Sequence, residues 1–216
     1  MKPDEAAATR KLELVYEATS RGKIFLSKEG AKDEFNRGCD HIHGLLRDSY
    51  NLYCSGSFAT SVFLSITAIE EIAKIEIAIF RNDERTVPAN RRNDRLFNHK
   101  AKHSIALQEA IVIGTRLPKA IGEERLRELL DMAESGKLLD LREAALYTDR
   151  VKGKFTCPLE RIPREAAREI LLLALEVWDD RLVGLTNHTE EINSTLEKLF
   201  DEIAAPIRYT FRLEQD

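Results

Sequence analysis

Ionisable residues stand inside a largely apolar segment of the sequence, FLSITAIEEIAKIEIAIF at residues 63–80, and three of them lie at its middle: Glu70, Glu71 and Lys74. At about 100° per residue, Glu70 and Lys74 fall on the same face of a helix, in the i,i+4 order that favours an ion pair. A charge inside a core costs several kcal/mol unless it is paired. Two interpretations therefore stand: a self-contained Glu70–Lys74 pair, or a polar cluster that faces a cleft or a symmetric interface, where functional ionisable groups concentrate.

A second polar segment, RNDRLFNHKAKH at residues 92–103, places His99, Lys102 and His103 at i, i+3 and i+4 on one helical face. Between residues 81 and 103 the sequence has seven Lys or Arg and three Asp or Glu, a net charge of +4 within an acidic chain. A locally basic surface of this kind could bind phosphate groups. The alternative is an ordinary solvated face.

The segment LREAALYTDR at residues 141–150 also has polar side chains that could bind a phosphate group. Arg142 and Tyr147 lie five positions apart on an otherwise apolar helix, so both could approach a shared site. The Arg142 guanidinium suits bidentate contacts with a phosphate or a carboxylate.

Helical periodicity runs through nearly the whole sequence, and Gly, Pro and polar capping residues break it into segments. We expect helices at residues 4–20, 28–54, 58–81, 95–114, 121–135, 137–150 and 163–199. No alternating strand pattern of useful length occurs, apart from a short extended tail at residues 207–212. The sequence thus predicts one all-α domain over residues 1–216, an antiparallel helical bundle with additional short helices.

Composition excludes several classes of protein. The chain has 216 residues, of which 43% are hydrophobic and 32% charged, as in an ordinary globular protein. No uncharged apolar stretch reaches about 18 residues and no secretory signal is recognisable, so we expect no membrane contact. Three widely spaced cysteines suit reduced thiols in the cytoplasm. The net charge of −4 predicts no general attraction to nucleic acid. The aromatic residues Phe155 and Trp178 are expected to be core or interface groups rather than platforms on which bases stack.

Cofactor and metal motifs are missing from the sequence. Cys39 and His43 at i,i+4 could supply half of a zinc site, but no second cluster offers the remaining ligands, because the other two cysteines are isolated. There is no Gly-rich phosphate loop, no G-x-S-x-G and no H-E-x-x-H. We therefore expect neither a metal nor a cofactor.

Three motifs occur in an order that resembles the AbiV family of bacterial abortive-infection proteins: AIEEIAK at 68–74, FNHKAKH at 97–103 and LREAALYTD at 141–149, the last followed by the loop VKGKFTCP. The resemblance covers about residues 30–180. AbiV-like proteins belong to the wider HEPN group of compact helical bundles, commonly dimeric, many of which are metal-independent ribonucleases of antiphage and toxin systems. The resemblance implies a HEPN-like ribonuclease that responds to phage and halts translation.

HEPN ribonucleases resemble one another in an Arg-x4–6-His motif, often with a polar residue directly after the Arg. Three segments of this sequence fit the spacing: Arg37 to His43, Arg92 to His99 and Arg181 to His188. We favour Arg92 and His99, because Asn93 follows the Arg and because His99 lies inside an AbiV-like motif. Against the usual pattern, Arg92 could lie in the loop before the helix rather than on it.

The resemblance also implies roles for the candidate residues. His99 would act as acid or base on the ribose 2′-OH and the leaving 5′-oxygen, and Arg92 would stabilise the charge of the phosphorane. One such His per chain suggests a site completed across the two-fold axis of a homodimer. Glu70, Glu71 and Lys74 would hold His99 or Arg142 in position, or would contact the RNA backbone. The expected catalytic set is Arg92, His99, Glu70, Glu71 and Lys74, and the expected RNA-binding set is Lys102, His103, Arg142 and Tyr147.

A non-catalytic function is the alternative hypothesis. The chain would then be a helical interaction module that dimerises and binds a phage or toxin-system protein, and a phage-encoded activator is also conceivable for the enzyme. The two hypotheses differ in the surroundings of His99. A solvent-reachable, basic cleft would favour catalysis, whereas a His packed into the core would favour the module.

Overall fold

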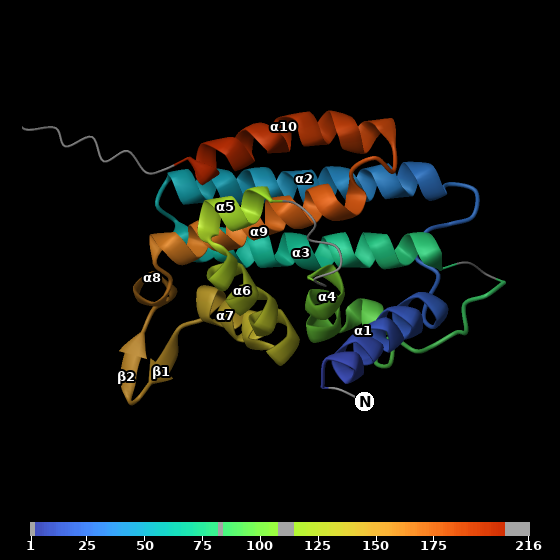
Figure 1. Cartoon of the computed structure of the whole chain (residues 1–216), viewed down its shortest axis with the longest axis horizontal. Helices are drawn as coiled ribbons and strands as arrows, with labels where there is room; N and C mark the ends of the chain where they lie inside the picture. The colour runs from blue at the N-terminus through green and yellow to red at the C-terminus, as the bar shows by residue number, and fades with distance from the viewer. Residues whose placement is uncertain (1–2, 82–83, 108–114, 206–216) are drawn as a thin grey trace, which may run out of the picture.

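Helices make up nearly all of the regular structure in residues 3–81, 84–107 and 115–205, the parts of the chain that the computed structural model describes (Figure 1). In chain order the elements are α1 (Pro3–Ser20), α2 (Ala31–Cys54), α3 (Phe58–Phe80), the 3-10 helix η1 (Arg95–Phe97), α4 (His99–Ala106), α5 (Arg116–Ile121), α6 (Glu123–Ser135), α7 (Lys137–Leu146), β1 (Asp149–Val151), β2 (Lys154–Thr156), α8 (Pro158–Arg161), α9 (Arg164–Leu182) and α10 (Asn187–Ala204). The predicted all-α class is confirmed.

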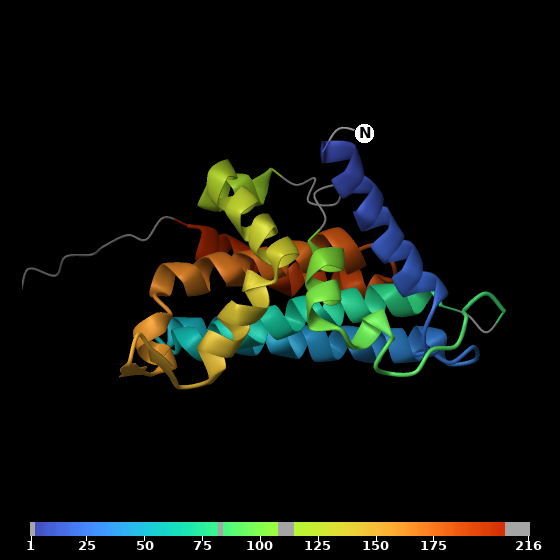
Figure 2. The same ribbon diagram turned by 90° about the horizontal axis from the view of Figure 1, so that it is seen from below.

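Four long helices form the bundle. Helix α2 runs antiparallel to α3, and α9 runs antiparallel to α10 (Figure 1). Helix α3 is the central one, because it packs against α2, α9, α4 and α7; Figure 1 shows α4 and α7 below α3 and α2 above it, and Figure 2 shows the same helices from below. This position explains a sequence that is apolar around most of the helix. Within the described residues, no helix is both long and apolar enough to cross a membrane.

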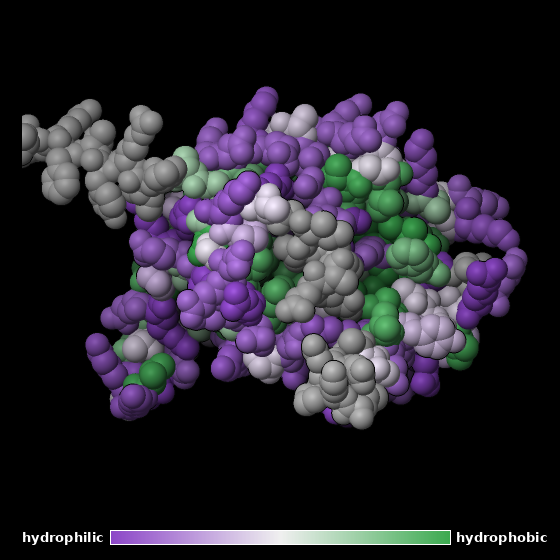
Figure 3. All heavy atoms as spheres, viewed as in Figure 1, coloured by the Kyte–Doolittle hydropathy of each residue, from purple (hydrophilic) through white to green (hydrophobic). Residues whose placement is uncertain are grey.

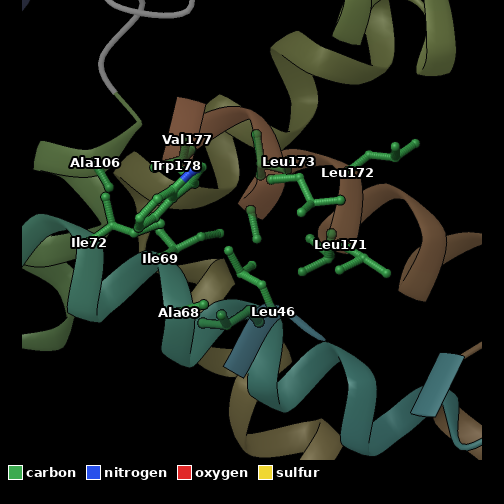
Figure 4. Packing of buried hydrophobic residues seen from close by; sticks show 14 of the residues in the cluster. Leu46, Ala68, Ile69, Ile72, Ala106, Leu171, Leu172, Leu173, Val177 and Trp178 are labelled. Atoms are coloured by element: carbon green, nitrogen blue, oxygen red, sulfur yellow. The ribbon is translucent and has the colours of Figure 1, made fainter. Parts of the chain in front are cut away.

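The core lies where α2, α3 and α9 meet. Trp178 is fully buried there beside Ile69, Ile72 and Ala106 (Figure 4). Its indole Nε1 donates to Asn193 Oδ1 at 3.2 Å, so the polar atom of the ring is satisfied. Each fully buried Ile or Leu side chain contributes roughly 1.5–3 kcal/mol to folding. The prediction of Trp178 as a core residue is confirmed.

The segment predicted as one helix at 163–199 is two helices, and that prediction was wrong. Gly184 adopts a φ of +82°, which reverses the chain after α9. Thr186 then caps α10, because its Oγ1 accepts from the backbone N–H of Thr189 at 3.2 Å. The sequence pattern of apolar residues continues through this turn, which hid the break.

The helix predicted at 95–114 is also divided. It begins as the 3-10 helix η1, and α4 starts only at His99, where Asn98 Oδ1 accepts from the backbone N–H of Ala101 at 2.8 Å. Helix α4 ends at Ala106. Residues 108–114 of the expected helix lie outside the described residues.

A small antiparallel hairpin follows α7, where the sequence predicted a helix to residue 150. The pairs are Asp149 with Thr156, Arg150 with Phe155 and Val151 with Lys154. Lys152 and Gly153 form the turn with φ of 50° and 81°, as a two-residue hairpin turn requires. Strands of three residues are too short to give an alternating pattern, so the sequence did not reveal them. The tail at 207–212 lies outside the described residues.

Candidate active site

The carboxylate of Glu70 is the centre of a polar cluster inside the helical core. Glu70 is 2% exposed and faces α4. Its Oε2 lies 2.7 Å from His99 Nδ1 and 3.1 Å from Lys102 Nζ, and its Oε1 lies 3.0 Å from His103 Nε2. The i, i+3, i+4 spacing on α4 therefore delivers three nitrogen groups to one carboxylate on α3.

The start of α4 determines how much solvent each of these residues meets. His99 is the first residue of the helix after the Asn98 cap, and its side chain is 45% exposed. One turn further, the side chains of Lys102 and His103 are 7% and 0% exposed. His99 is thus at the mouth of the cluster and His103 at its floor.

Arg142 on α7 is the fifth member of what we call the Glu70 cluster: Glu70, His99, Lys102, His103 and Arg142. Its Nε lies 3.6 Å from Glu70 Oε1, and its guanidinium lies over the ring of Phe63 at 4.8 Å. Its Nη1 lies 3.3 Å from Glu143 Oε1 on the same helix. The buried Nε has no hydrogen-bond partner among the described residues. Arg142 is therefore held next to Glu70 by charge rather than by a hydrogen bond.

The cluster holds Glu70 as an anion. Burial alone would raise the pKa of Glu70, but the hydrogen bond from His103 and the nearby Lys102, His103 and His99 groups outweigh burial and lower this pKa to about 2. An ionised carboxylate only accepts hydrogen bonds, so His99 Nδ1 and His103 Nε2 are the donors. Lys102 and Arg142 exceed the charge of Glu70 by one before any charge on the imidazoles is counted, so the cluster has a net positive charge.

This arrangement suits proton transfer at His99. Because Nδ1 donates to Glu70, the Nε2 atom of the half-exposed ring carries the free lone pair. A carboxylate behind an imidazole fixes its tautomer and orientation and stabilises the imidazolium that forms when Nε2 takes a proton. His103 cannot act in the same way, because it is fully buried.

Glu71 and Lys74 lie outside the Glu70 cluster. The expected Glu70–Lys74 ion pair is not formed: Lys74 Nζ instead lies 2.8 Å from Glu71 Oε2 and 4.8 Å from the centroid of the Phe25 ring. Glu70 turns towards α4, where three donors surround its carboxylate. The pattern of the helix correctly placed Glu70 and Lys74 near one face but could not show which partner each side chain selects.

Arg92 is not brought to His99. It lies in the exposed turn at residues 91–93, before η1, as its place in a loop had suggested. No hydrogen bond or ion pair within the described parts of the chain joins Arg92 to His99. Arg142, 43 positions after His99, is the arginine that the fold places in the cluster. Tyr147, directly after α7, is 56% exposed, and within the described residues its side chain makes no hydrogen bond to the cluster.

The Arg181–His188 spacing also separates in the structure. Arg181 is buried, where it pairs with Glu76 at 2.7 Å and donates to the carbonyl oxygens of Ile105 and Ala106 at 2.6 and 3.0 Å. His188 instead lies 2.7 Å from Asp40 Oδ1. Arg181 thus holds the last carbonyls of α4 and positions that helix, a role that the sequence analysis missed. Its signal was an Arg at the end of the apolar run of α9.

The Cys39–His43 pair does not extend to a metal site. Burial and then the neighbouring Asp40 raise the pKa of the Cys39 thiol to about 12, which disfavours the thiolate that zinc requires. Burial lowers the pKa of His43, with a contribution from Arg47. No group of three or more His, Cys, Asp or Glu side chains suited to a metal occurs in the described part of the structure.

Comparison with known proteins gives one match. The model of the HEPN-type family described as AbiV matches residues 37–179, a span that contains every member of the Glu70 cluster. Neither curated proteins nor solved structures gave a match. The matched span agrees with the resemblance found at about residues 30–180 in the sequence.

Proposed function

The chain belongs to the AbiV family of HEPN-type abortive-infection proteins, and from this premise we propose that it is a metal-independent endoribonuclease. It would cleave host or phage RNA in the cytoplasm and so halt translation in an infected cell. The observation that carries the proposal is the half-exposed His99, held through Nδ1 by the buried Glu70 at 2.7 Å, with Arg142 beside the same carboxylate.

The proposed reaction is a transesterification at an RNA phosphate. His99 Nε2 takes the proton of a ribose 2′-OH, the 2′-oxygen forms a bond to phosphorus, and the bond from phosphorus to the 5′-oxygen breaks. The products are a 2′,3′-cyclic phosphate and a 5′-OH end. Arg142 donates to the phosphoryl oxygens and stabilises the charge that develops on them. Glu70, Lys102 and His103 act through His99 and Arg142, which they position.

The leaving 5′-oxygen needs a proton, and the Glu70 cluster offers one half-exposed imidazole. We propose that a second copy of the chain supplies the other His99, so that a homodimer carries the complete set of acid and base. A phage-encoded protein that changes the dimer could then act as an activator.

Incubation of the purified protein with total bacterial RNA in EDTA tests the proposal. We expect cleavage that His99→Ala abolishes and His188→Ala preserves. His188 is the matched control, because it also pairs with a carboxylate at 2.7 Å but lies outside the Glu70 cluster. Circular dichroism of each variant verifies its folding.

Two results would reject parts of the proposal. Cleavage that persists in His99→Ala would remove His99 from the mechanism and leave His43 or His188 as candidates. No cleavage by the wild-type chain, even after addition of phage-infected lysate, would instead indicate the non-catalytic interaction module.

A further inference from the structure

Exposed apolar side chains are concentrated in one short segment after α7. Of the twelve large hydrophobic residues exposed among the described residues, five lie between residues 146 and 159: Leu146, Tyr147, Val151, Phe155 and Leu159. Single exposed apolar residues are ordinary, but a local concentration marks a surface that binds something. Phe155 was expected to be a core or interface group, and because it is 57% exposed it is not a core residue.

The same segment is basic. The hairpin at residues 149–156 has Arg150, Lys152 and Lys154 against the single acid Asp149, a net charge of +2 in a chain whose net charge is −4. Within the described residues, neither lysine has an ion-pair or hydrogen-bond partner for its ammonium group. The ligand that complements this surface is therefore an anion.

The register of the hairpin places an aromatic ring and a guanidinium on one face. Arg150 is paired directly with Phe155, so their Cβ atoms lie about 4.5–5.5 Å apart on the same side of the two strands. Every residue of the two strands except Thr156 is exposed. In Figure 3 hydrophobic and hydrophilic residues stand side by side where Figure 1 shows β1 and β2.

We propose that the β1–β2 hairpin is an RNA-binding arm of the protein, in which Phe155 stacks on an unpaired base while Arg150, Lys152 and Lys154 contact the flanking phosphates. This inference rests on the proposed ribonuclease function and names the element that receives the substrate. Base stacking on an aromatic ring combined with cations for the backbone is the means by which proteins hold single-stranded RNA.

The position of the hairpin in the chain connects it to the Glu70 cluster. Helix α7, which carries Arg142, ends at Leu146, and β1 begins three residues later. At about 1.5 Å per helical residue and 3.3 Å per extended residue, Arg142 and Asp149 are at most roughly 16 Å apart along the chain. A strand of RNA held by the arm thus needs only a few nucleotides to reach Arg142. A duplex would not fit this mode, because its bases are already stacked on one another.

Binding of a 2′-O-methyl oligonucleotide tests the arm separately from cleavage, because this RNA lacks the 2′-OH nucleophile. We would titrate the full chain into a fluorescent single-stranded 12-mer and measure anisotropy. Phe155→Ala should raise Kd about 5- to 100-fold, whereas Phe155→Trp, which keeps a stacking ring, should leave it roughly unchanged. Lys154→Ala should reduce the slope of log Kd against log salt by about 0.7. Leu185→Ala is the control, since that side chain is also exposed and apolar but lies between α9 and α10, outside the segment 146–159.

Equal affinity of wild-type and Phe155→Ala protein would overturn the proposal, as would equal affinity for the matching duplex. Absence of any binding by the wild-type chain would overturn it too, and would leave an acidic protein as the ligand of the hairpin. Binding that depends on Phe155 without cleavage of ordinary RNA would keep the arm and reject the ribonuclease. Cleavage of ordinary RNA that is unchanged in Phe155→Ala would keep the ribonuclease and reject the arm.

Discussion

The imidazole of His99 and the carboxylate of Glu70 are 29 positions apart in the sequence and 2.7 Å apart in the structure. This contact explains why the apolar helix α3 contains an acidic residue at its centre. Glu70 accepts hydrogen bonds from donors on α4 and forms an ion pair with Arg142 of α7, so one carboxylate joins three helices. Its burial makes it costly to leave unpaired, and its partners make it useful for holding a histidine at the surface.

Replacement of Glu70 should destabilise the fold and abolish cleavage together. In Glu70→Gln the buried Lys102 loses its counter-ion, and we expect a loss of about 3–5 kcal/mol in the free energy of unfolding. Glu71→Gln is the control, because Glu71 pairs with Lys74 nearer the surface and should cost at most about 1 kcal/mol. Urea denaturation measures both values. Similar losses in the two variants would contradict a special role for Glu70.

The ionisation of Glu70 should also appear in the acid stability. The pKa of Glu70 is lowered in the folded chain to about 2 from an ordinary value of 4.5, so its stabilisation is present above pH 4.5 and is lost as the pH falls towards 2. The difference in unfolding free energy between the wild type and Glu70→Gln should therefore shrink over this range. Denaturation curves of both proteins at several pH values measure this difference. A difference in unfolding free energy that does not change with pH would refute the prediction.

Asp180 should have the opposite pH dependence. Burial first, and then the nearby Glu176 and Asp179, raise the pKa of Asp180 to about 6, and its Oδ2 has no hydrogen-bond partner among the described residues. The folded state therefore loses stability as the pH rises from about 3.8 to 6. Asp180→Asn should stabilise the protein at pH 7 by about 1–3 kcal/mol and have little effect below pH 4.

Asp179→Asn is the comparison for this measurement. Asp179 lies 3.3 Å from Arg116 and accepts from Asn193 at 3.0 Å, so its carboxylate is paired. Thermal unfolding at pH 7 should show destabilisation by Asp179→Asn and stabilisation by Asp180→Asn. The same sign for both variants would argue against the assigned cause.

Arg142 and Arg92 should differ in their effect on RNA cleavage. Under the proposed function, Arg142→Ala removes the cation next to the reacting phosphate and should lower kcat about 10²- to 10³-fold. Arg92→Ala, in the exposed turn, should leave kcat within a few-fold of the wild type. Single-turnover cleavage of a defined RNA compares the two. A large loss in Arg92→Ala alone would restore the Arg92–His99 motif that the sequence favoured.

Much of the candidate site could be predicted from local sequence. The i, i+3, i+4 spacing of His99, Lys102 and His103 correctly predicted a shared helical face. The charges in the apolar segment drew attention to Glu70 together with Glu71 and Lys74, and of these three only Glu70 lies in the cluster. Three ordered motifs also identified the family, since each is a local pattern. These features depend on helical periodicity and residue type, which the chain itself determines.

Only the tertiary structure decided which of these residues meet. Periodicity shows which side chains share a face but not which helix lies opposite. In the structure Glu70 accepts hydrogen bonds from α4 and pairs with Arg142 of α7, while Lys74 pairs with Glu71. The same limit applies to Arg142, which reaches the cluster although Arg92 is far closer to His99 in sequence. The short hairpin depends on the pairing of two three-residue strands and a turn with positive φ. The sequence by itself thus determined the helices and their polar faces, while the packing of α3 between two layers determined the site.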